Sequence, residues 1–335
     1  MRLPIRTAGK WVAAGALAAA GLGLAAAAPG APRLGVPIAC EFGRNCEIQH
    51  YVDRDPGPGV LDYRCAHRTY EGHNGVDFRI PDMKAEAAGV DVLAAASGRV
   101  ARLRDGVADI SIRAPGAPSV KGTECGNGVV IEHGDGWETQ YCHLARGSLR
   151  VKPGDAVSAG QPIGRVGLSG DTEFPHMHFT VRHAGQVVDP FAPGPVSAGA
   201  CPAQPSLWTP DAARRLAYKA GAVLNIGLAG APVTAESIES GQIAPPSAAA
   251  PVLAAYGRVI EPQQGDEIEV VLSGPGGAAL ASQRLPPLER DKAQYFQMVG
   301  RKRPAAGWPK GNYTASMRLW RAGKVAVERR ATATL

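Results

Sequence analysis

Short strand-like runs joined by glycine turns are the feature that most limits what this chain can fold into. Residues 127–133 contain a β-branched run, residues 134–136 read Gly-Asp-Gly, and residues 137–141 run back. Glycine turns of about three residues between such runs are typical of β-hairpins. Glycine (42) and proline (28) make up about a fifth of the 335 residues, which favours short strands over long helices. The sequence therefore predicts an all-β, antiparallel domain over residues 61–192.

The composition changes after this domain. Residues 193–209 are rich in proline, alanine and glycine, a composition typical of a linker. Strand-like runs return at residues 266–272, 313–320 and 325–332. A chain of this length has room for two domains of about 100–200 residues each. We therefore expect residues 210–335 to form a second, β-sandwich-like domain.

The N-terminus has the three-part layout of a secretory signal. Arg2, Arg6 and Lys10 precede an uncharged stretch rich in alanine and glycine, which ends in four alanines at residues 25–28. A stretch of about 18 apolar residues could just span a bilayer as an anchor. Alanine and glycine are poor anchoring residues, so we predict that residues 1–28 are cleaved. The mature protein is then expected to be periplasmic or extracellular, beginning with a cysteine-bearing extension over residues 29–60.

The charge of the chain narrows the choice of partners. The net charge is +6, which suits an anionic neighbourhood such as a cell wall or membrane surface. No basic run is interleaved with aromatic residues, so nucleic acid is not an expected partner.

An even number of cysteines in an exported chain predicts disulfide bonds. Six cysteines permit 15 pairings, and the sequence does not choose among them. Cys40 and Cys46 are close enough for a local bridge, and Cys125 and Cys142 flank one predicted hairpin. The remaining two are Cys65 and Cys201, and none of the six has the C-x-x-C spacing of a structural zinc site.

Three short motifs contain four of the eight histidines and one aspartate. In a strand, His73 and Asp77 would share one face with Gly75, which has no side chain to fill the space between them. His176 and His178 would share a face in the same way. The third motif, residues 141–144, carries His143 at the end of the predicted hairpin.

This set of side chains suits a hydrolytic zinc site. Catalytic zinc usually has three protein ligands, commonly imidazole and carboxylate, and one open position. Four histidines and one aspartate exceed that need by two residues, which could move protons or stabilise an oxyanion. Because the chain has no H-E-x-x-H motif, an imidazole must act as the base.

In this order, the motifs resemble those of the lysostaphin-type (LytM-like) zinc metallopeptidases, which cut peptide cross-bridges of bacterial peptidoglycan. That family carries an H-x-x-x-D element, a Tyr-x-His-Leu element and an H-x-H element. Here they stand at residues 73–77, 141–144 and 176–178, within a resemblance that covers residues 60–192. The resemblance implies a two-sheet antiparallel β domain with the site in a groove. It also implies one zinc ion on His73, Asp77 and His178, with His143 and His176 as catalytic residues.

The resemblance further implies a zinc metallo-endopeptidase that cuts either stem-to-stem cross-links or interpeptide bridges. Residues 171–174 depart from a usually Ser/Thr- and Gly-rich loop, so the groove wall is expected to differ. Residues 29–60 could lie over the groove. We expect the protein to act as a monomer on peptidoglycan, with residues 210–335 as a targeting or regulatory module open to an envelope protein partner.

Three other functions are open at this point. A non-catalytic activator of wall hydrolases would lack one or more of the five positions, whereas a secreted zinc protease acting on non-wall proteins would keep them all. Residues 151–167 also resemble a biotin- or lipoyl-carrying barrel, but Lys152 is followed by Pro153 and is poorly placed at a hairpin tip. The four other histidines are expected to be structural or exposed: His50, His67, His133 and His183.

Overall fold

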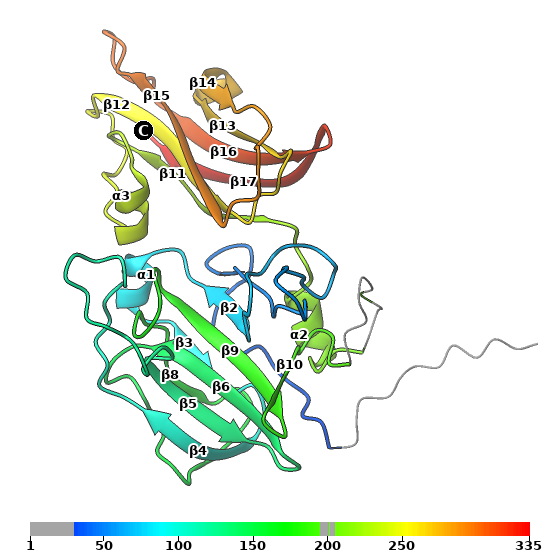
Figure 1. Ribbon diagram of the computed structural model, residues 1–335. Helices are drawn as coiled ribbons and strands as arrows, with labels where there is room; N and C mark the ends of the chain where they lie inside the picture. The colour runs from blue at the N-terminus through cyan, green and yellow to red at the C-terminus, as the bar shows by residue number, and fades with distance from the viewer. Residues whose placement is uncertain (1–29, 195–200, 202–204) are drawn as a thin grey trace, which may run out of the picture.

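The computed structural model describes residues 30–194, 201 and 205–335 (Figure 1). The predicted signal, residues 1–28, lies outside the described residues. Within the described ranges, no helix is long and apolar enough to cross a membrane.

An eight-stranded antiparallel sheet forms the first part of the molecule (Figure 1). Its order is β1-β2-β9-β6-β5-β4-β7, and β10 pairs with β9. The strands are β1 (Glu47–Ile48), β2 (Val76–Arg79), β4 (Gly98–Arg104), β5 (Asn127–Glu132), β6 (Trp137–Leu144), β7 (Ala156–Val157), β9 (His176–His183) and β10 (Gln186–Val188). A two-stranded sheet of β3 (Asp91–Leu93) and β8 (Pro162–Arg165) shares its core, and α1 (Met83–Ala88) connects β2 to β3. The two-sheet antiparallel prediction is therefore confirmed.

The centre of the large sheet brings the sequence motifs together. β9 lies between β2 and β6, and the β5–β6 hairpin predicted from the sequence is present. His178 of β9 is the direct cross-strand neighbour of Asp77 on one side and of Cys142 on the other. On the opposite face of β9, Met177 and Phe179 are fully buried in the core. One face of this strand thus anchors the sheet while the other carries the motif residues.

Two further sheets form the C-terminal part. The strands β11 (Ala222–Ala229), β12 (Val252–Ile260) and β15 (Gln294–Lys302) form one sheet, and β14 (Ala279–Arg284), β13 (Glu267–Ser273), β16 (Asn312–Arg321) and β17 (Lys324–Thr334) form the other in that order. Both sheets contribute to one apolar core, with Val259 from the first and Ile268 and Met317 from the second. The β-sandwich prediction is confirmed, and the predicted runs at residues 313–320 and 325–332 lie in the β16–β17 hairpin. A short 3₁₀ helix, η1 (Pro275–Gly277), follows β13.

Two short helices lie near the junction of the two parts. In α2 (Pro210–Arg215), the Thr209 side chain caps the N-terminus, and the helix packs on the core of the first part through Ala212. The other helix, α3 (Ala235–Ser240), begins with a capping box at Thr234 and lies beside α1 (Figure 1). Side chains and backbone from both parts therefore meet directly at this boundary.

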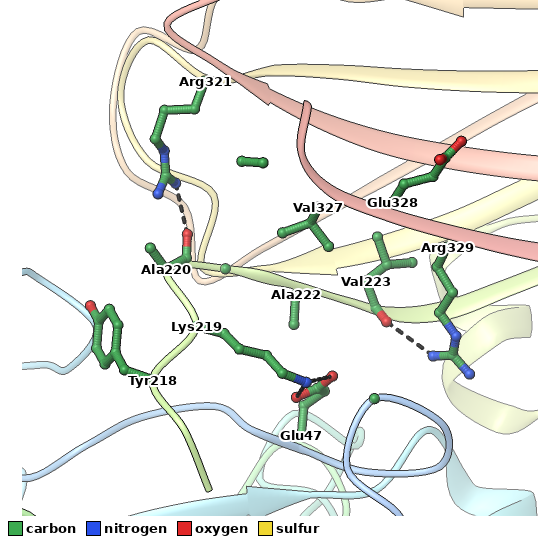
Figure 2. A pocket seen from close by; sticks show the side chains of 13 residues that line it. Glu47, Tyr218, Lys219, Ala220, Ala222, Val223, Arg321, Val327, Glu328 and Arg329 are labelled. Carbon is green, nitrogen blue, oxygen red and sulfur yellow. Dashed lines mark hydrogen bonds and ion pairs between the residues drawn. The ribbon is translucent and has the colours of Figure 1, made fainter. Parts of the chain in front are cut away.

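A cavity of about 510 Å³ lies at the same boundary (Figure 2). The charged side chains of its walls already have hydrogen-bond partners within the molecule. Lys219 Nζ lies 2.8 Å from Glu47 Oε1, Arg321 donates to the carbonyl of Ala220 (2.7 Å), and Arg329 donates to the carbonyl of Val223 (3.0 Å). These bonds tie the start of β11 to β1 and to the β16–β17 hairpin.

Three disulfide bonds cross-link the described chain. Two of them are pairings that the sequence left possible, Cys40–Cys46 and Cys125–Cys142. The third joins Cys65 to Cys201 across 136 residues.

Candidate metal centre

The three predicted metal ligands come from different local structures. Asp77 is on β2 and His178 is on β9. The sequence pattern placed His73 in a strand together with Asp77. In the structure β2 begins only at Val76, so His73 reaches the site from the loop before the strand. Gly75 does leave the room predicted for it, because a Cβ at this position would lie 2.5 Å from His178 Nε2.

Three donor atoms converge at the end of β9. His73 Nε2 lies 3.2 Å from Asp77 Oδ1 and 3.2 Å from His178 Nδ1, and the last two atoms are 2.9 Å apart. Zinc binds imidazole nitrogen and carboxylate oxygen at about 2.0–2.2 Å, so tetrahedral ligand atoms lie about 3.3 Å from one another. The three side chains could therefore hold one metal ion, and both their chemistry and their spacing fit zinc.

Both imidazoles of this group are fixed by a second contact on the far side of the ring. His73 Nδ1 donates to the carbonyl of Tyr51 (2.6 Å), and His178 Nε2 lies 3.0 Å from Asn74 Oδ1 and 3.1 Å from Thr180 Oγ1. Such contacts set the tautomer, so that the other ring nitrogen offers its lone pair to a metal. They account for the ligand atoms that face the centre, Nε2 of His73 and Nδ1 of His178.

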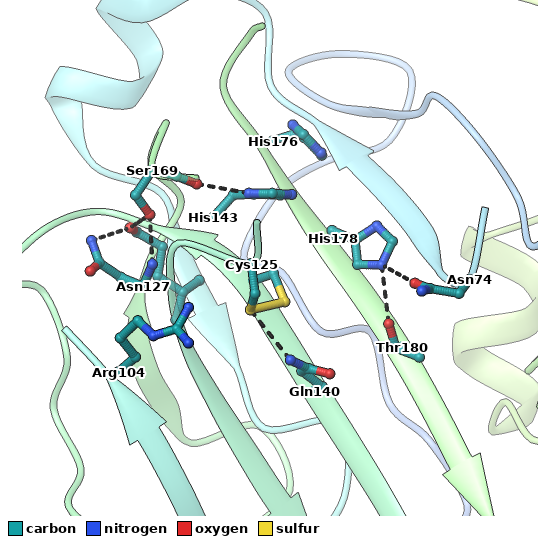
Figure 3. The surroundings of a disulfide bond; sticks show 12 residues. Asn74, Arg104, Cys125, Asn127, Gln140, His143, Ser169, His176, His178 and Thr180 are labelled. Atoms are coloured by element: carbon teal, nitrogen blue, oxygen red, sulfur yellow. Dashed lines mark hydrogen bonds between the residues drawn. A yellow bond between two sulfur atoms is a disulfide. The ribbon is translucent and has the colours of Figure 1, made fainter. Parts of the chain in front are cut away.

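His143 and His176 flank the same centre (Figure 3). Their ring centroids are 4.6 Å apart, and His176 Nε2 lies 3.5 Å from Asp77 Oδ1. His143 Nδ1 donates to the carbonyl of Ser169 (2.8 Å), and His176 Nδ1 donates to that of Phe174 (3.0 Å). Both rings thus keep Nε2 free for chemistry. The structure brings all five predicted site residues together.

The backbone holds His143 in an uncommon conformation. Its φ is 61°, in the left-handed region that non-glycine residues rarely adopt. The His143 N–H donates to the carbonyl of Cys125 (2.8 Å), and the neighbouring Cys142 is bonded to Cys125 (Figure 3). Residues kept in such conformations are over-determined by their surroundings and cluster at functional sites. The disulfide therefore supports the placement of His143.

Burial sets the charge state of the site. It holds the pKa of His143 well below its usual value, and the charges of His176 and His178 lower it further. Burial likewise lowers the pKa of His176 to about 4. For Asp77, burial alone would raise the pKa, but the charges of His73 and His176 hold it well below its usual value. At neutral pH, His143 and His176 are thus neutral imidazoles beside the Asp77 carboxylate, and a neutral imidazole is the form that accepts a proton.

An open groove of about 330 Å³ leads to this centre. Its walls include His143, His178 and the Cys125–Cys142 disulfide. No residue of the described stretch 30–60 lines it, and this segment lies behind the ligands, where Tyr51 contacts His73. The unusual loop at residues 171–174 does form part of the wall through Asp171.

Two residues near the centre were not predicted from the sequence. His50 Nδ1 lies 3.0 Å from Asp77 Oδ2, and His50 Nε2 lies 3.2 Å from Glu261 Oε1, beyond the end of β12. Burial lowers the pKa of His50, but hydrogen bonds to these two carboxylates outweigh it and raise the pKa to about 9. No local motif around either residue could reveal this contact.

The other three histidines are structural or exposed, as expected. His67 is paired with Asp291 at the surface, His133 contacts the carbonyl of Ser97, and His183 is exposed beside Trp137.

Comparison with known proteins identifies the first part of the chain. The sequence pattern of Peptidase family M23 matches residues 71–190. The chain is 31% identical over 125 residues to the cell division protein DipM of Caulobacter vibrioides, covering 37% of this chain and 17% of DipM. It is 34% identical over 117 residues to the peptidoglycan DD-endopeptidase ShyA of Vibrio cholerae, covering 35% of this chain and 22% of ShyA.

The aligned stretch thus spans about a fifth of the length of these two relatives. Among solved structures, the catalytic domain of lysostaphin from Staphylococcus simulans aligns with 25% identity and a TM-score of 0.27, covering 42% of this chain and 85% of that domain. Residues 71–190 of this chain form a Peptidase family M23 domain.

Proposed function

We propose that this protein is an exported zinc metallo-endopeptidase that hydrolyses peptide cross-links of bacterial peptidoglycan. The observation that carries the proposal is the convergence of His73 Nε2, Asp77 Oδ1 and His178 Nδ1 within 3.2 Å of one another. Two further imidazoles with free Nε2 atoms stand beside these three atoms, at the head of an open groove.

The residues divide into two groups by what they would do. His73, Asp77 and His178 would hold the ion, which when bound supplies Lewis acidity and lowers the pKa of water to about 7. His143 and His176 are neutral and fixed through Nδ1, so their Nε2 atoms are placed to take a proton from the attacking water. Once protonated, the same rings can stabilise the oxyanion or protonate the leaving amine.

The peptidoglycan substrate rests on three supports. ShyA, a relative over this domain, is named as a peptidoglycan DD-endopeptidase. The N-terminal sequence reads as a secretory signal, and three disulfide bonds suit an oxidising compartment outside the cytoplasm. In this proposal the protein acts as a monomer, which light scattering of the purified chain would test.

The decisive experiment is digestion of purified peptidoglycan, with mass analysis of the released fragments. The wild-type protein should release cross-link fragments, and a zinc chelator should stop the release. His178→Ala should lose both bound zinc and activity. His67→Ala, a matched replacement at an exposed histidine, should keep both.

Full activity of His178→Ala or of the chelated protein would overturn the zinc mechanism. Stoichiometric zinc without any release of fragments would instead favour a non-catalytic activator of other wall hydrolases. Cleavage of unrelated proteins at rates equal to cross-link cleavage would favour a general secreted protease.

A further inference from the structure

The groove extends from the metal centre along one face of β9. His178, Thr180 and Arg182 alternate along this strand, and all three line the groove. Their cross-strand neighbours on β6 are Cys142, Gln140 and Glu138, respectively. Because residues two apart on a strand share a face, the groove floor is a short ladder that begins at a proposed zinc ligand and ends at a guanidinium.

Arg182 is the groove's only lysine or arginine, and it has no carboxylate partner in the described part of the chain. The obvious candidate, Glu138, lies directly opposite but is held by Arg102 through contacts of 3.1 and 3.2 Å. Arg182 instead donates through Nη1 to Gln140 Oε1 (2.6 Å), which draws its guanidinium one ladder step towards His178. The Nε and Nη2 donors of this half-buried side chain are left for another acceptor.

We propose that Arg182 binds a free carboxylate of the peptide substrate, close to the scissile bond. The proposal rests on the proposed function and adds to it the chemical class of the substrate, an acidic peptide. The planar guanidinium matches a carboxylate with two parallel hydrogen bonds, and a half-buried guanidinium favours an anionic partner. The acidic groove residues Glu124 and Asp171 would repel a carboxylate, so Arg182 is the place in the groove that accepts one.

The strand geometry sets where that carboxylate must be. Gln140, which holds the guanidinium, is one ladder step of two residues from the Cys142–His178 pair, or about 7 Å along the strand. An extended peptide spans about 3.3–3.6 Å per residue. The carboxylate therefore belongs to a substrate residue within about two positions of the bond that is cut.

The test uses two synthetic peptides that reproduce the cross-link identified by digestion. They differ only in carrying a free carboxylate or a carboxamide beside the scissile bond. Wild-type protein should cleave the acid with a KM about 10–100-fold lower than that of the amide, in line with the strength of a charge-assisted pair. Arg182→Gln should raise the KM for the acid by the same factor, leave the amide unaffected and retain its zinc.

Arg182→Lys should recover part of the preference for the acid peptide, because lysine keeps the positive charge but lacks the paired N–H donors of the guanidinium. Arg104→Gln, a matched replacement of an exposed arginine outside the groove, should behave like the wild type. Equal KM values for acid and amide in the wild type would overturn the carboxylate site while leaving the endopeptidase function intact. Failure of the wild type to cut peptidoglycan at all would overturn the proposed function itself.

A separate set of contacts links the C-terminal sandwich to the metal centre. Asp77 Oδ2 is 3.0 Å from His50 Nδ1, and His50 Nε2 is 3.2 Å from Glu261 Oε1. The same Glu261 oxygen accepts from Gln49 Nε2 at 3.0 Å. The side chains of His50 and Glu261 are only 12% and 11% exposed, so water competes little with these bonds.

The surroundings hold Glu261 in place. Its φ is 53°, and its backbone N–H donates to the carbonyl of Ala293. Beside it, Gln49 Oε1 accepts from Arg79 Nη1 (2.8 Å), and Arg79 Nη2 pairs with Glu239 of α3 (3.0 Å). The contact between the two parts is therefore a connected hydrogen-bond network and not a single bridge.

We further propose that Glu261 is a positioning residue for the metal centre. Through His50 it fixes the orientation of the Asp77 carboxylate, so that Oδ1 faces His73 and His178. Partners of metal ligands typically change metal affinity by about 10–100-fold when they are removed. This assigns the C-terminal sandwich a role in metal retention.

The test is zinc affinity, measured by competition with a chromogenic chelator on the full-length mature chain. Glu261→Ala should weaken zinc binding about 10–100-fold, and Glu261→Gln, which keeps an acceptor oxygen, should recover part of the loss. The absorption spectrum of the cobalt-substituted protein should shift in Glu261→Ala. Glu267→Gln, an acidic residue of β13 paired with Arg284 in the same sandwich, should have no effect on either readout.

A purely structural role for Glu261 would give a different result. The melting temperatures of the metal-free and zinc-loaded forms would then fall by equal amounts, with zinc affinity and cobalt spectrum unchanged. That outcome would overturn the positioning role.

Discussion

The peptidase sheet and the C-terminal sandwich are both antiparallel, but they place polar side chains differently. In β13 of the sandwich, the buried residues Ile268, Val270 and Leu272 alternate with half-buried neighbours. In β9 of the peptidase sheet, both faces are largely covered, and one of them carries His176 and His178. A sheet with one solvent-exposed face needs only an alternation of buried apolar and exposed polar residues. A buried face that carries polar side chains needs a hydrogen-bond partner for each of their polar atoms.

This difference indicates which interactions stabilise each part of the molecule. The sandwich is held by apolar burial, and its buried polar side chains number only a few, such as Asp266 and Gln297. The covered face of β9 depends on hydrogen bonds to each imidazole and, in the proposed function, on a cation. Substitutions on the two faces of β9 and in the two parts should therefore separate folding from metal binding.

The largest expected effect is that of Phe179→Ala, on the apolar face of β9. The ring is fully buried and packs against Tyr141 and Trp208, with centroids 5.3 and 5.8 Å away. Removing it should lower the free energy of unfolding by about 3–5 kcal/mol. Denaturant unfolding of the metal-free Phe179→Ala protein would measure this loss. The same measurement on His178→Ala, a substitution on the opposite face of β9, provides the comparison. Equal losses in the two variants would show that the faces of β9 do not differ as described.

The next effect is expected in the sandwich core. Leu272→Ala removes a fully buried side chain of β13 and should cost about 2–5 kcal/mol of stability. Because the leucine is in the apolar core and makes no polar contact with the metal centre, the zinc content of the folded protein should not change. Metal analysis of the purified variant tests this, and a loss of zinc in the folded fraction would contradict the separation.

Removal of the Cys125–Cys142 disulfide should have an intermediate effect. These cysteines are 17 residues apart, and closing a loop of that size stabilises a protein by about 3 kcal/mol. The paired Cys125→Ala and Cys142→Ala replacements should also lower activity, since they release the backbone that holds His143. Replacing Cys40 and Cys46, only six residues apart, provides the control and should cost less stability with no loss of activity per folded molecule.

The smallest effect is expected at the sandwich surface. Glu267→Gln breaks an exposed pair with Arg284 and should change the unfolding free energy by less than about 1 kcal/mol. Thermal unfolding at low and high salt would measure it. A larger loss would mean that the outer face of β13 contributes more to the unfolding free energy than a solvent-exposed sheet face ordinarily does.

The five clustered site residues could be picked out from the sequence, whereas the residues that hold them in place could not. Five residues lie in three short motifs, so their pattern is visible within a few positions of one another. His50 and Glu261, by contrast, are 211 positions apart in the sequence and come into contact only in the folded chain. Their neighbouring residues carry no periodic signal that could reveal such a contact.

The strands were predicted unevenly for a related physical reason. β13 and β16 alternate between buried and half-exposed positions along much of their length, which a sequence pattern can show. β12 is buried at most positions on both faces, and its alanines and Gly257 give no alternation. Buried strands of this kind are hard to separate from other apolar segments by periodicity alone.

The long-range disulfide has a consequence for how the protein withstands proteases. Cys65 and Cys201 enclose every strand from β2 to β10, and with them all five site residues. A single cut at any exposed loop between the two cysteines leaves both fragments covalently attached, so the groove can survive nicking. On a gel, such a nicked molecule would migrate as one intact chain until a reductant separated its pieces.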